Sequence, residues 1–299
     1  MTDSVKGALL TMFGGMCWGV SGCVGQYLFT RQGMDSTWLV PIRLFLAGLI
    51  LCAFFFVKNR KMLFDPWNFK KNPRNVVDLL IYGLAGVSCC QFTYFLTIQL
   101  SSAGMGTILQ DLSPVIILLV VCIQQRRGPR VFEIFSILLA LVGVALVVYN
   151  GHFILKISPL GDFLTLLAAF SWAFYSLIMK KMSGRYRTTF ITRKIFFYGI
   201  LTILPAFILH PWQFSLSGLW QPAVWMNLLF LGVLASLVCF VVWNIILKQL
   251  GTVRASNYIY LNPLFTLIGS AVLLDEQFTV MSLMGAMLIL GGVYWAGKR

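Results

Sequence analysis

The sequence has little charge. Lys, Arg, Asp and Glu together make up 11% of its 299 residues, whereas 59% are hydrophobic and the mean hydropathy is +0.85. Soluble globular domains carry charge on about a quarter of their residues, so this composition excludes that class. We therefore predict an integral membrane protein in which no separate soluble domain holds the function.

The sequence also lacks the residue patterns of the main enzyme classes. It has two histidines, neither deep in an apolar run, and it contains neither an H-E-x-x-H motif nor a nucleotide-binding G-x-x-x-x-G-K-[ST] loop. A membrane-embedded enzyme would need a nucleophile with its base, paired carboxylates or a metal cluster. We therefore predict neither catalysis nor a bound metal or cofactor.

The seven cysteines all fall inside apolar runs. No pair has the loop setting of a disulfide framework or the spacing of a metal cage, so we interpret them as small core residues. The first apolar run, from about residue 7 to 29, is too long for a signal-peptide core and lacks a small-x-small cleavage site. It is expected to remain as a spanning helix.

Ten apolar runs are long enough to cross a bilayer, which takes about 20 mainly apolar residues per helix. This count predicts an all-α integral membrane protein with ten transmembrane helices. The predicted spans are 6–29, 36–57, 76–99, 102–124, 131–150, 159–182, 189–209, 223–247, 252–273 and 278–297.

The basic residues indicate the orientation, because short loops rich in Lys and Arg stay in the cytoplasm. With the N-terminus inside, all but Arg31, Arg43 and Lys156 of the 23 Lys and Arg residues lie at the cytoplasmic ends of the spans. We therefore predict a multi-pass plasma membrane protein with both termini in the cytoplasm. The net charge of +14 then reports topology and contact with anionic lipid, and no nucleic acid partner is predicted.

The second half of the chain repeats the first. We predict two five-helix units, residues 1–150 and 151–299. A unit with an odd number of crossings must re-enter the membrane from the opposite side, so the repeats are inverted, as in many secondary transporters. Gly7, Leu10, Thr11 and Trp18 match Gly161, Leu164, Thr165 and Trp172 at an offset of 154, and Leu112, Pro114, Gly143 and Val144 match Leu261, Pro263, Gly292 and Val293 at 149.

One stretch, residues 107–114, places a carboxylate and a proline inside a long apolar run. An Asp at the centre of a membrane helix costs about 2.5–3.5 kcal/mol and persists mainly where it faces a bundle interior or a water-filled cavity. Pro114 removes a backbone N–H and is expected to bend the helix beside Asp111. A related stretch, residues 259–263, returns in the second half with Asn262 before its proline.

These residues carry a resemblance to a known family. Residues 243–256, Leu261-Asn-Pro263, Asp275-Glu276, Gly285 and Gly291-Gly-Val293 resemble the EamA repeat of the drug/metabolite transporter superfamily. The resemblance implies ten helices with cytoplasmic termini and a central cavity lined by helices 1–4 and 6–9. Members of the family export amino acids, other metabolites or drugs. The sequence departs from the family pattern at Arg127, which stands where the repeat has a glutamate.

Arg43 and Asp111 are the two charges expected at membrane depth. At 1.5 Å per residue they lie about 10 and about 14 Å from the outer face, close enough in height to form a pair across the cavity. The pair is either structural or part of a site for a charged substrate or a proton. With the polar and aromatic residues expected around them, the predicted substrate-binding set is Trp18, Arg43, Gln91, Tyr94, Gln110, Asp111, Trp172, Trp243, Asn244, Asn257, Tyr258 and Asn262.

Two further patterns leave alternatives open. Trp18 and Trp172 occupy equivalent places halfway along two predicted spans, where they either line the cavity or only pack. The glycines of the first span serve close helix packing or act as a hinge. Gly285, Gly291 and Gly292, with Ser136, Ala140 and Gly143, are interpreted as packing faces between the fifth and tenth spans.

The predicted function is secondary transport. We expect an exporter of small amphipathic metabolites, such as amino acids, that works by alternating access through a central cavity. The alternatives are export of cationic drugs or nucleobase-type compounds, and lipid flipping on the same fold. The expected partners are a small-molecule substrate and membrane lipid, with a proton as the candidate coupling ion and a monomer or homodimer as the functional unit.

Overall fold

The computed structural model describes residues 3–58, 77, 81, 83–100, 103–149, 159–183, 188–209, 216–273, 277 and 279–297. Every regular element in this part of the chain is a helix. The connection between the second and third predicted spans, residues 59–76, lies outside the described residues, as does the Asp275-Glu276 pair.

Each of the ten predicted spans coincides with helical structure in the described ranges. Four spans are interrupted or change helix type along their length, and one short helix, α11 (Leu216–Leu219), was not predicted. The helices are α1 (Asp3–Gln32), α2 (Ser36–Lys58), η1 (Leu84–Cys89) with α5 (Cys90–Leu100), α6 (Ala103–Gln110) with α7 (Ser113–Gln124), α8 (Val131–Tyr149), α9 (Pro159–Ser183), α10 (Thr188–Leu209), α12 (Pro222–Leu229) with η2 (Phe230–Val238) and α13 (Cys239–Leu250), α14 (Thr252–Asn257) with η3 (Tyr258–Leu261) and α15 (Asn262–Leu273), and α16 (Val280–Gly297).

The helices have the length and composition of membrane spans. Within the described residues, four are both long and apolar enough to cross a bilayer: 36–54, 131–149, 159–182 and 222–250. The outward faces of α8 and α16 carry exposed apolar side chains such as Leu138, Val142, Leu283 and Met287. A helix that is apolar on all sides belongs in a large core or in lipid, so the chain is a membrane protein.

The predicted bend in the fourth span is confirmed. Helix α6 ends at Gln110, a turn covers Asp111 and Leu112, and α7 begins at Ser113 with Pro114 in its first turn. The corresponding place in the second half is also irregular, because the 3₁₀ segment η3 precedes α15 and Pro263 follows its first residue. Proline supplies no N–H to the preceding turn, which explains both interruptions.

Two π-helical segments, η1 and η2, occupy the third span of each half. The wider π turn leaves backbone carbonyls for side-chain donors, and the Ser236 hydroxyl donates to the Leu231 carbonyl at 2.8 Å. Ser88 lies near the end of η1 and donates to the Gly199 carbonyl of α10 at 2.7 Å. Such segments occur mostly as local bulges and often lie at functional sites.

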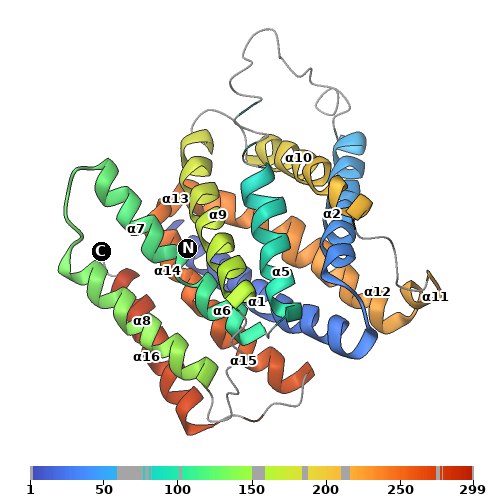
Figure 1. Cartoon of the computed structure of the whole chain (residues 1–299). Coiled ribbons are helices and arrows are strands. Elements are labelled where there is room, and N and C mark those ends of the chain that lie inside the picture. The colour runs from blue at the N-terminus through green and yellow to red at the C-terminus, as the bar shows by residue number, and fades with distance from the viewer. Residues whose placement is uncertain are drawn as a thin grey trace.

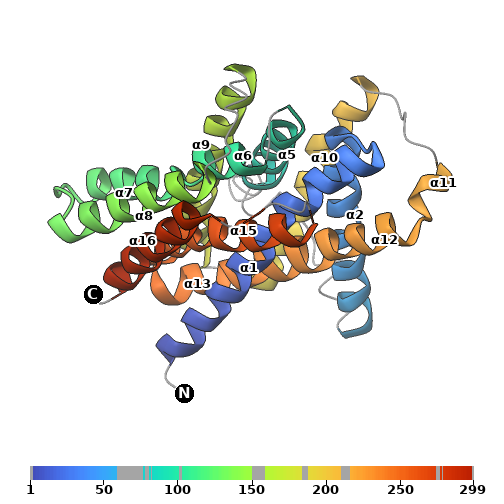
Figure 2. The same cartoon turned by 90° about the horizontal axis from the view of Figure 1, so that it is seen from below.

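The helices pack in pairs that join the two halves of the chain. Helix α1 packs on α15 and α9 packs on α6 and α7, while α2 contacts η2 and α10 contacts η1. The green α8 and the red α16 lie side by side in both views (Figures 1 and 2). The core is therefore built mostly from contacts between residues that are distant in sequence.

Helices α8 and α16 approach closely because glycines face each other. A Cβ atom at Gly143 would come within 2.6 Å of the Gly285 carbonyl, and one at Gly292 within 2.8 Å of the Ser136 carbonyl. These packing faces were predicted from the sequence and are confirmed. Gly291 is different, because a Cβ there would meet only the Leu139 side chain at 3.5 Å, an ordinary contact.

We predict opposite effects for two neighbouring substitutions in α16. Gly292→Ala should force the helices apart and lower the free energy of unfolding by about 1–3 kcal/mol, the usual cost of overpacking. Gly291→Ala should leave stability unchanged or raise it by up to about 1 kcal/mol, since alanine favours helix more than glycine does. Thermal unfolding of both variants in one detergent tests this, and equal melting temperatures would contradict the packing assignment.

Candidate functional site

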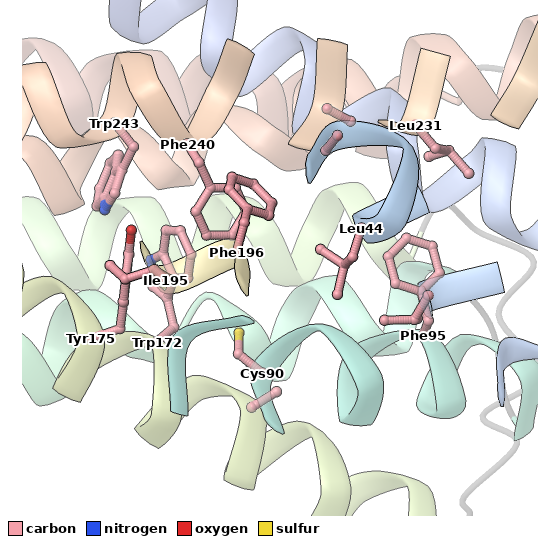
Figure 3. Close-up of a cluster of buried hydrophobic side chains, with 14 of the residues drawn as sticks. Leu44, Cys90, Phe95, Trp172, Tyr175, Ile195, Phe196, Leu231, Phe240 and Trp243 are labelled. Carbon is pink, nitrogen blue, oxygen red and sulfur yellow. The ribbon is translucent and has the colours of Figure 1, made fainter. Parts of the chain in front are cut away.

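A cluster of aromatic side chains lies where α1, α9, α10 and α13 meet. The rings of Trp18 and Trp172 are 5.1 Å apart, and Trp243 lies 5.4 Å from Trp172 and 5.6 Å from Trp18. Figure 3 shows Trp172 and Tyr175 of α9 pointing toward Trp243, with Phe240 of α13 and Phe196 of α10 packed together beside them. The contacts of Trp18 with Trp172 and with Trp243 are edge-to-face, an arrangement that aromatic pairs prefer.

Trp18 is fixed by a hydrogen bond as well as by packing. Its indole Nε1 donates to the Ala235 carbonyl of η2 at 2.8 Å, which joins the first helix of the chain to the π segment of the second half. Trp18 and Trp172 also line a cavity, so the two matched tryptophans both pack and face open space.

This central cavity, of about 60 Å³, lies between α1, α5, α6, α9 and α15. Ligand pockets commonly measure about 300–1,000 Å³, so the cavity has room for a few water molecules and must widen to admit a metabolite. Polar side chains share its wall with two rings of the aromatic cluster, Trp18 and Trp172. It brings together seven residues of the predicted set: Trp18, Gln91, Tyr94, Gln110, Asp111, Trp172 and Asn262.

Among the described residues of the cavity wall, Asp111 is the only one with a charged side chain, and it is 1% exposed. Neither carboxylate oxygen has a hydrogen-bond partner among the described residues. The phenols of Tyr94 and Tyr260 lie close enough to interact electrostatically with it, and no described Lys, Arg or His forms an ion pair with it. A buried carboxylate without a partner is strongly unfavourable, so the site requires a proton or a cationic ligand.

The structure contradicts the predicted pairing of Arg43 with Asp111. Arg43 is buried, but its Nε donates to the Ser236 hydroxyl at 2.9 Å and its guanidinium carbon lies 4.7 Å from the Phe95 ring centroid. Its two terminal nitrogens have no partner among the described residues, and it does not line the central cavity. Similar depth in the membrane means that two side chains lie at the same height, but it does not determine the direction in which each points. Arg43 projects from the face of α2 that packs on η2.

The other four predicted residues also lie away from the central cavity. Asn244 is fully buried and joins three helices, since its side chain accepts from the Tyr175 hydroxyl and donates to Thr192, both at 3.0 Å. Trp243 and Tyr258 line a narrow crevice beside α1, and Asn257 faces a second cavity. Asn244 is thus satisfied by packing partners, which corrects its assignment to the cavity wall.

The sequence interpretation missed several residues of the cavity wall. Thr107 lies one helical turn before Asp111 and Thr266 one turn after Asn262, so the four-residue spacing on these helices was the available signal. Thr266 also donates to the Gly19 carbonyl at 3.0 Å, which binds α15 to the glycine face of α1. The missed wall residues are Gly19, Ser21, Cys90, Thr107, Ile259 and Thr266.

A second, larger cavity of about 920 Å³ lies where α7, α9 and α13 end and α8 and α14 begin. We call it the basic vestibule, because one Glu and five Lys or Arg side chains line it. Asn257 lies on its wall, one residue before the η3 segment that reaches the central cavity at Ile259. The charged residues of the vestibule are Arg127, Arg130, Glu133, Lys180, Lys181 and Arg254.

We predict that mutation can separate the two roles of Trp172, contact with the substrate and packing within the aromatic cluster. Trp172→Ala removes a ring that faces the cavity and should weaken substrate binding by about 1–3 kcal/mol. Trp243→Ala removes a ring of the same cluster that does not line the cavity, so it should lower the melting temperature and leave affinity unchanged. Equal loss of affinity in the two variants would assign Trp172 to packing alone.

Comparison with known proteins agrees with this architecture. The model of the EamA-like transporter family matches residues 5–149 and 159–297. The chain is 31% identical over 294 residues to "Uncharacterized inner membrane transporter YicL" of Salmonella typhimurium, covering 98% of this chain and 95% of that protein. It is 27% identical over 240 residues to "Probable amino-acid metabolite efflux pump" of Escherichia coli, covering 76% and 78%.

A solved crystal structure has the same fold, with a TM-score of 0.76 at 16% identity and 97% coverage of both chains. The sequence resemblance described above is thereby confirmed over nearly the whole chain. The chain belongs to the EamA-like transporter family, a family of membrane transporters.

Proposed function

We propose that the chain is a secondary transporter that exports small amphipathic metabolites, amino acids among them, across the plasma membrane by alternating access. The observation that carries this proposal is the unpartnered Asp111 on the wall of a cavity that also presents two tryptophans and three amide side chains. The name of the Escherichia coli relative, an amino-acid metabolite efflux pump, supports this substrate class.

The cavity offers complementary groups for such a substrate. Trp18 and Trp172 form an apolar wall that suits a hydrocarbon or aromatic side chain. The amides of Gln91, Gln110 and Asn262 offer both donors and acceptors, and the Gln110 and Asn262 side-chain oxygens have no partner among the described residues. Asp111 would receive the substrate ammonium, or a proton as the coupling ion when no cation is bound.

The packing of the helices supports two inverted five-helix units, residues 1–150 and 151–299. Helix α1 of the first unit packs on the ninth span, and its counterpart α9 packs on the fourth span. In the same way α2 contacts η2, and its counterpart α10 contacts η1. Each contact between the units therefore occurs twice, the second time with the corresponding helices of the two units exchanged. A pseudo-two-fold axis in the membrane plane would require this.

The cavities support a conformation open at the cytoplasmic end. Under the orientation given by the basic residues, the vestibule of about 920 Å³ faces the cytoplasm, whereas the central cavity has a volume of only about 60 Å³. Transport would then require the central cavity to widen and the outer ends of the helices to separate.

Flux into proteoliposomes tests the proposed function. Purified protein should carry at least one radiolabelled amino acid faster than protein-free vesicles do, and a pH gradient should drive its accumulation if a proton is coupled. Cationic dyes and nucleobases serve as the competing substrate classes. Scrambling of labelled lipid in the same vesicles without flux of any soluble compound would replace the proposal with lipid flipping.

The proposed orientation makes a separate prediction. In a variant without native cysteines, Arg126→Cys in the linker between α7 and α8 should react with an impermeant maleimide only after the cell is opened. Arg31→Cys at the end of α1 should react in intact cells, since this end is proposed to face outward. Both positions are exposed, so protection reports the membrane barrier. Reaction of both cysteines in intact cells would reject the inverted arrangement.

A further inference from the structure

The basic vestibule concentrates positive charge more than topology requires. The tendency of Lys and Arg to remain in the cytoplasm places them at helix ends, but it does not direct them into one cavity. Here five come from three separate parts of the chain: Arg127 and Arg130 from the linker before α8, Lys180 and Lys181 from the end of α9, and Arg254 from α14.

The one carboxylate among the described residues of the vestibule wall, that of Glu133, is already neutralised. Arg127 holds Glu133 with two parallel bonds of 2.8 Å, and the Arg130 backbone N–H adds a third bond of 2.7 Å. The Lys180 ammonium donates to the carbonyls of Leu247 and Lys248 at the end of α13. Three cations, Arg130, Lys181 and Arg254, therefore face the cavity with no ion pair to any described carboxylate.

The vestibule has the size of a ligand site and leads inward. Its volume of about 920 Å³ lies within the usual range of about 300–1,000 Å³ for ligand pockets. Asn257 lies on its wall and Asn262 on the wall of the central cavity, so the short η3 segment separates the two spaces. Asn257 on the vestibule wall and Ile259 on the wall of the central cavity are two residues apart in the chain, so the same segment borders both spaces.

We propose that the basic vestibule binds small organic anions, those bearing a carboxylate or a phosphate, before they enter the central cavity. This inference rests on the proposed function, and it narrows the substrate class to solutes with an anionic group. A cleft lined by one sign of charge with low-dielectric walls can raise local concentration and association rates of the opposite charge by about 10-fold to 1,000-fold. The effect weakens as ionic strength rises.

Charged thiol reagents measure this potential without knowledge of the substrate. Gln124 is exposed and lines the vestibule, so Gln124→Cys in a variant without native cysteines places a reporter thiol there. The anionic sulfonatoethyl and the cationic trimethylammonioethyl methanethiosulfonates are the two probes. Relative to a free thiol, the ratio of anionic to cationic modification rates should be about 10-fold higher at low salt.

Two charge-matched double variants identify the source of the potential. Lys181→Gln with Arg254→Gln removes two vestibule charges and should return the ratio most of the way to that of the free thiol. Arg126→Gln with Lys248→Gln removes two charges that do not line the vestibule and should leave most of the excess in place. Two results would overturn the proposal. One is a rate ratio at Gln124→Cys, with all vestibule charges present, that equals the ratio of a free thiol. The other is an equal fall of the rate ratio in both double variants.

Competition distinguishes soluble anions from lipid. Glutamate should slow modification by the anionic reagent more than glutamine does at the same concentration, because the two differ mainly in charge. If phosphatidylglycerol in the micelles removes the excess and glutamate has no effect, the vestibule is a lipid headgroup site and the proposal is wrong. These measurements do not require transport. The proposal for the vestibule and the proposed function can therefore be rejected independently of each other.

Discussion

Asp111→Asn is expected to abolish transport and leave the protein folded in the membrane. Asn keeps the size and planar shape of the side chain but can neither bind a proton nor pair with an ammonium group. In the central cavity the carboxyl group has no partner among the described residues, so a neutral amide should hold its place at no cost in stability. Flux into proteoliposomes, together with melting in detergent, measures the two effects.

Two other substitutions make this expectation specific. Asp111→Glu retains the charge on a longer side chain and should keep part of the transport rate. Asp35→Asn makes the same chemical change outside the cavity, at the turn before α2, where the carboxylate accepts the Thr37 backbone N–H at 2.7 Å. Because Asn caps a helix about as well as Asp does, this change should cost little stability and keep transport. Normal flux by Asp111→Asn would remove Asp111 from the proposed site.

The position of Asp111 was predictable because its signals are local. An acidic residue in a long apolar run is expensive in lipid, and Pro114 three residues later marks a broken helix. The ten spans were predictable for a similar reason, since the thickness of the bilayer sets the length of each apolar run. Both features depend on residues that are close in sequence, and the structure agrees with both.

The partners of Arg43 were not predictable, because they depend on the rotation of α2 about its axis. The sequence gives the height of a residue in the membrane but not the direction of its side chain. The π segment η2 supplies Ser236 as the partner, and such segments are rare enough that none was predicted from the sequence. The pairing with Asp111 therefore failed although both residues are buried as expected.

The basic vestibule shows a similar limit. Each of its Lys and Arg residues was identified as a topology signal, and that interpretation took account of one loop at a time. Their convergence depends on how α7, α9 and α14 pack, which the loops do not encode. Arg127 illustrates the point, since it departs from the family pattern and yet binds Glu133, six residues further along, with two hydrogen bonds.

Arg43→Met is expected to remove transport while leaving the melting temperature unchanged or higher. The guanidinium is 1% exposed, and two of its three nitrogens have no partner among the described residues. Replacing a poorly compensated buried charge with an apolar side chain of similar volume is often neutral or stabilises by about 1–4 kcal/mol. A charge retained at that cost points to a function, which we infer to be an anion contact in another conformation of the cycle.

Ser236→Ala and the double variant separate this role from a structural one. Ser236→Ala removes the acceptor for Arg43 Nε but keeps the charge, so it should slow transport less than Arg43→Met does. Because no ion pair joins Arg43 to Asp111, the stability changes of Arg43→Met and Asp111→Asn should add within about 0.5 kcal/mol. The double variant should remain inactive. If it regained transport, the two charges would compensate each other, and Arg43 would act as the counter-charge of Asp111 rather than as an independent anion contact.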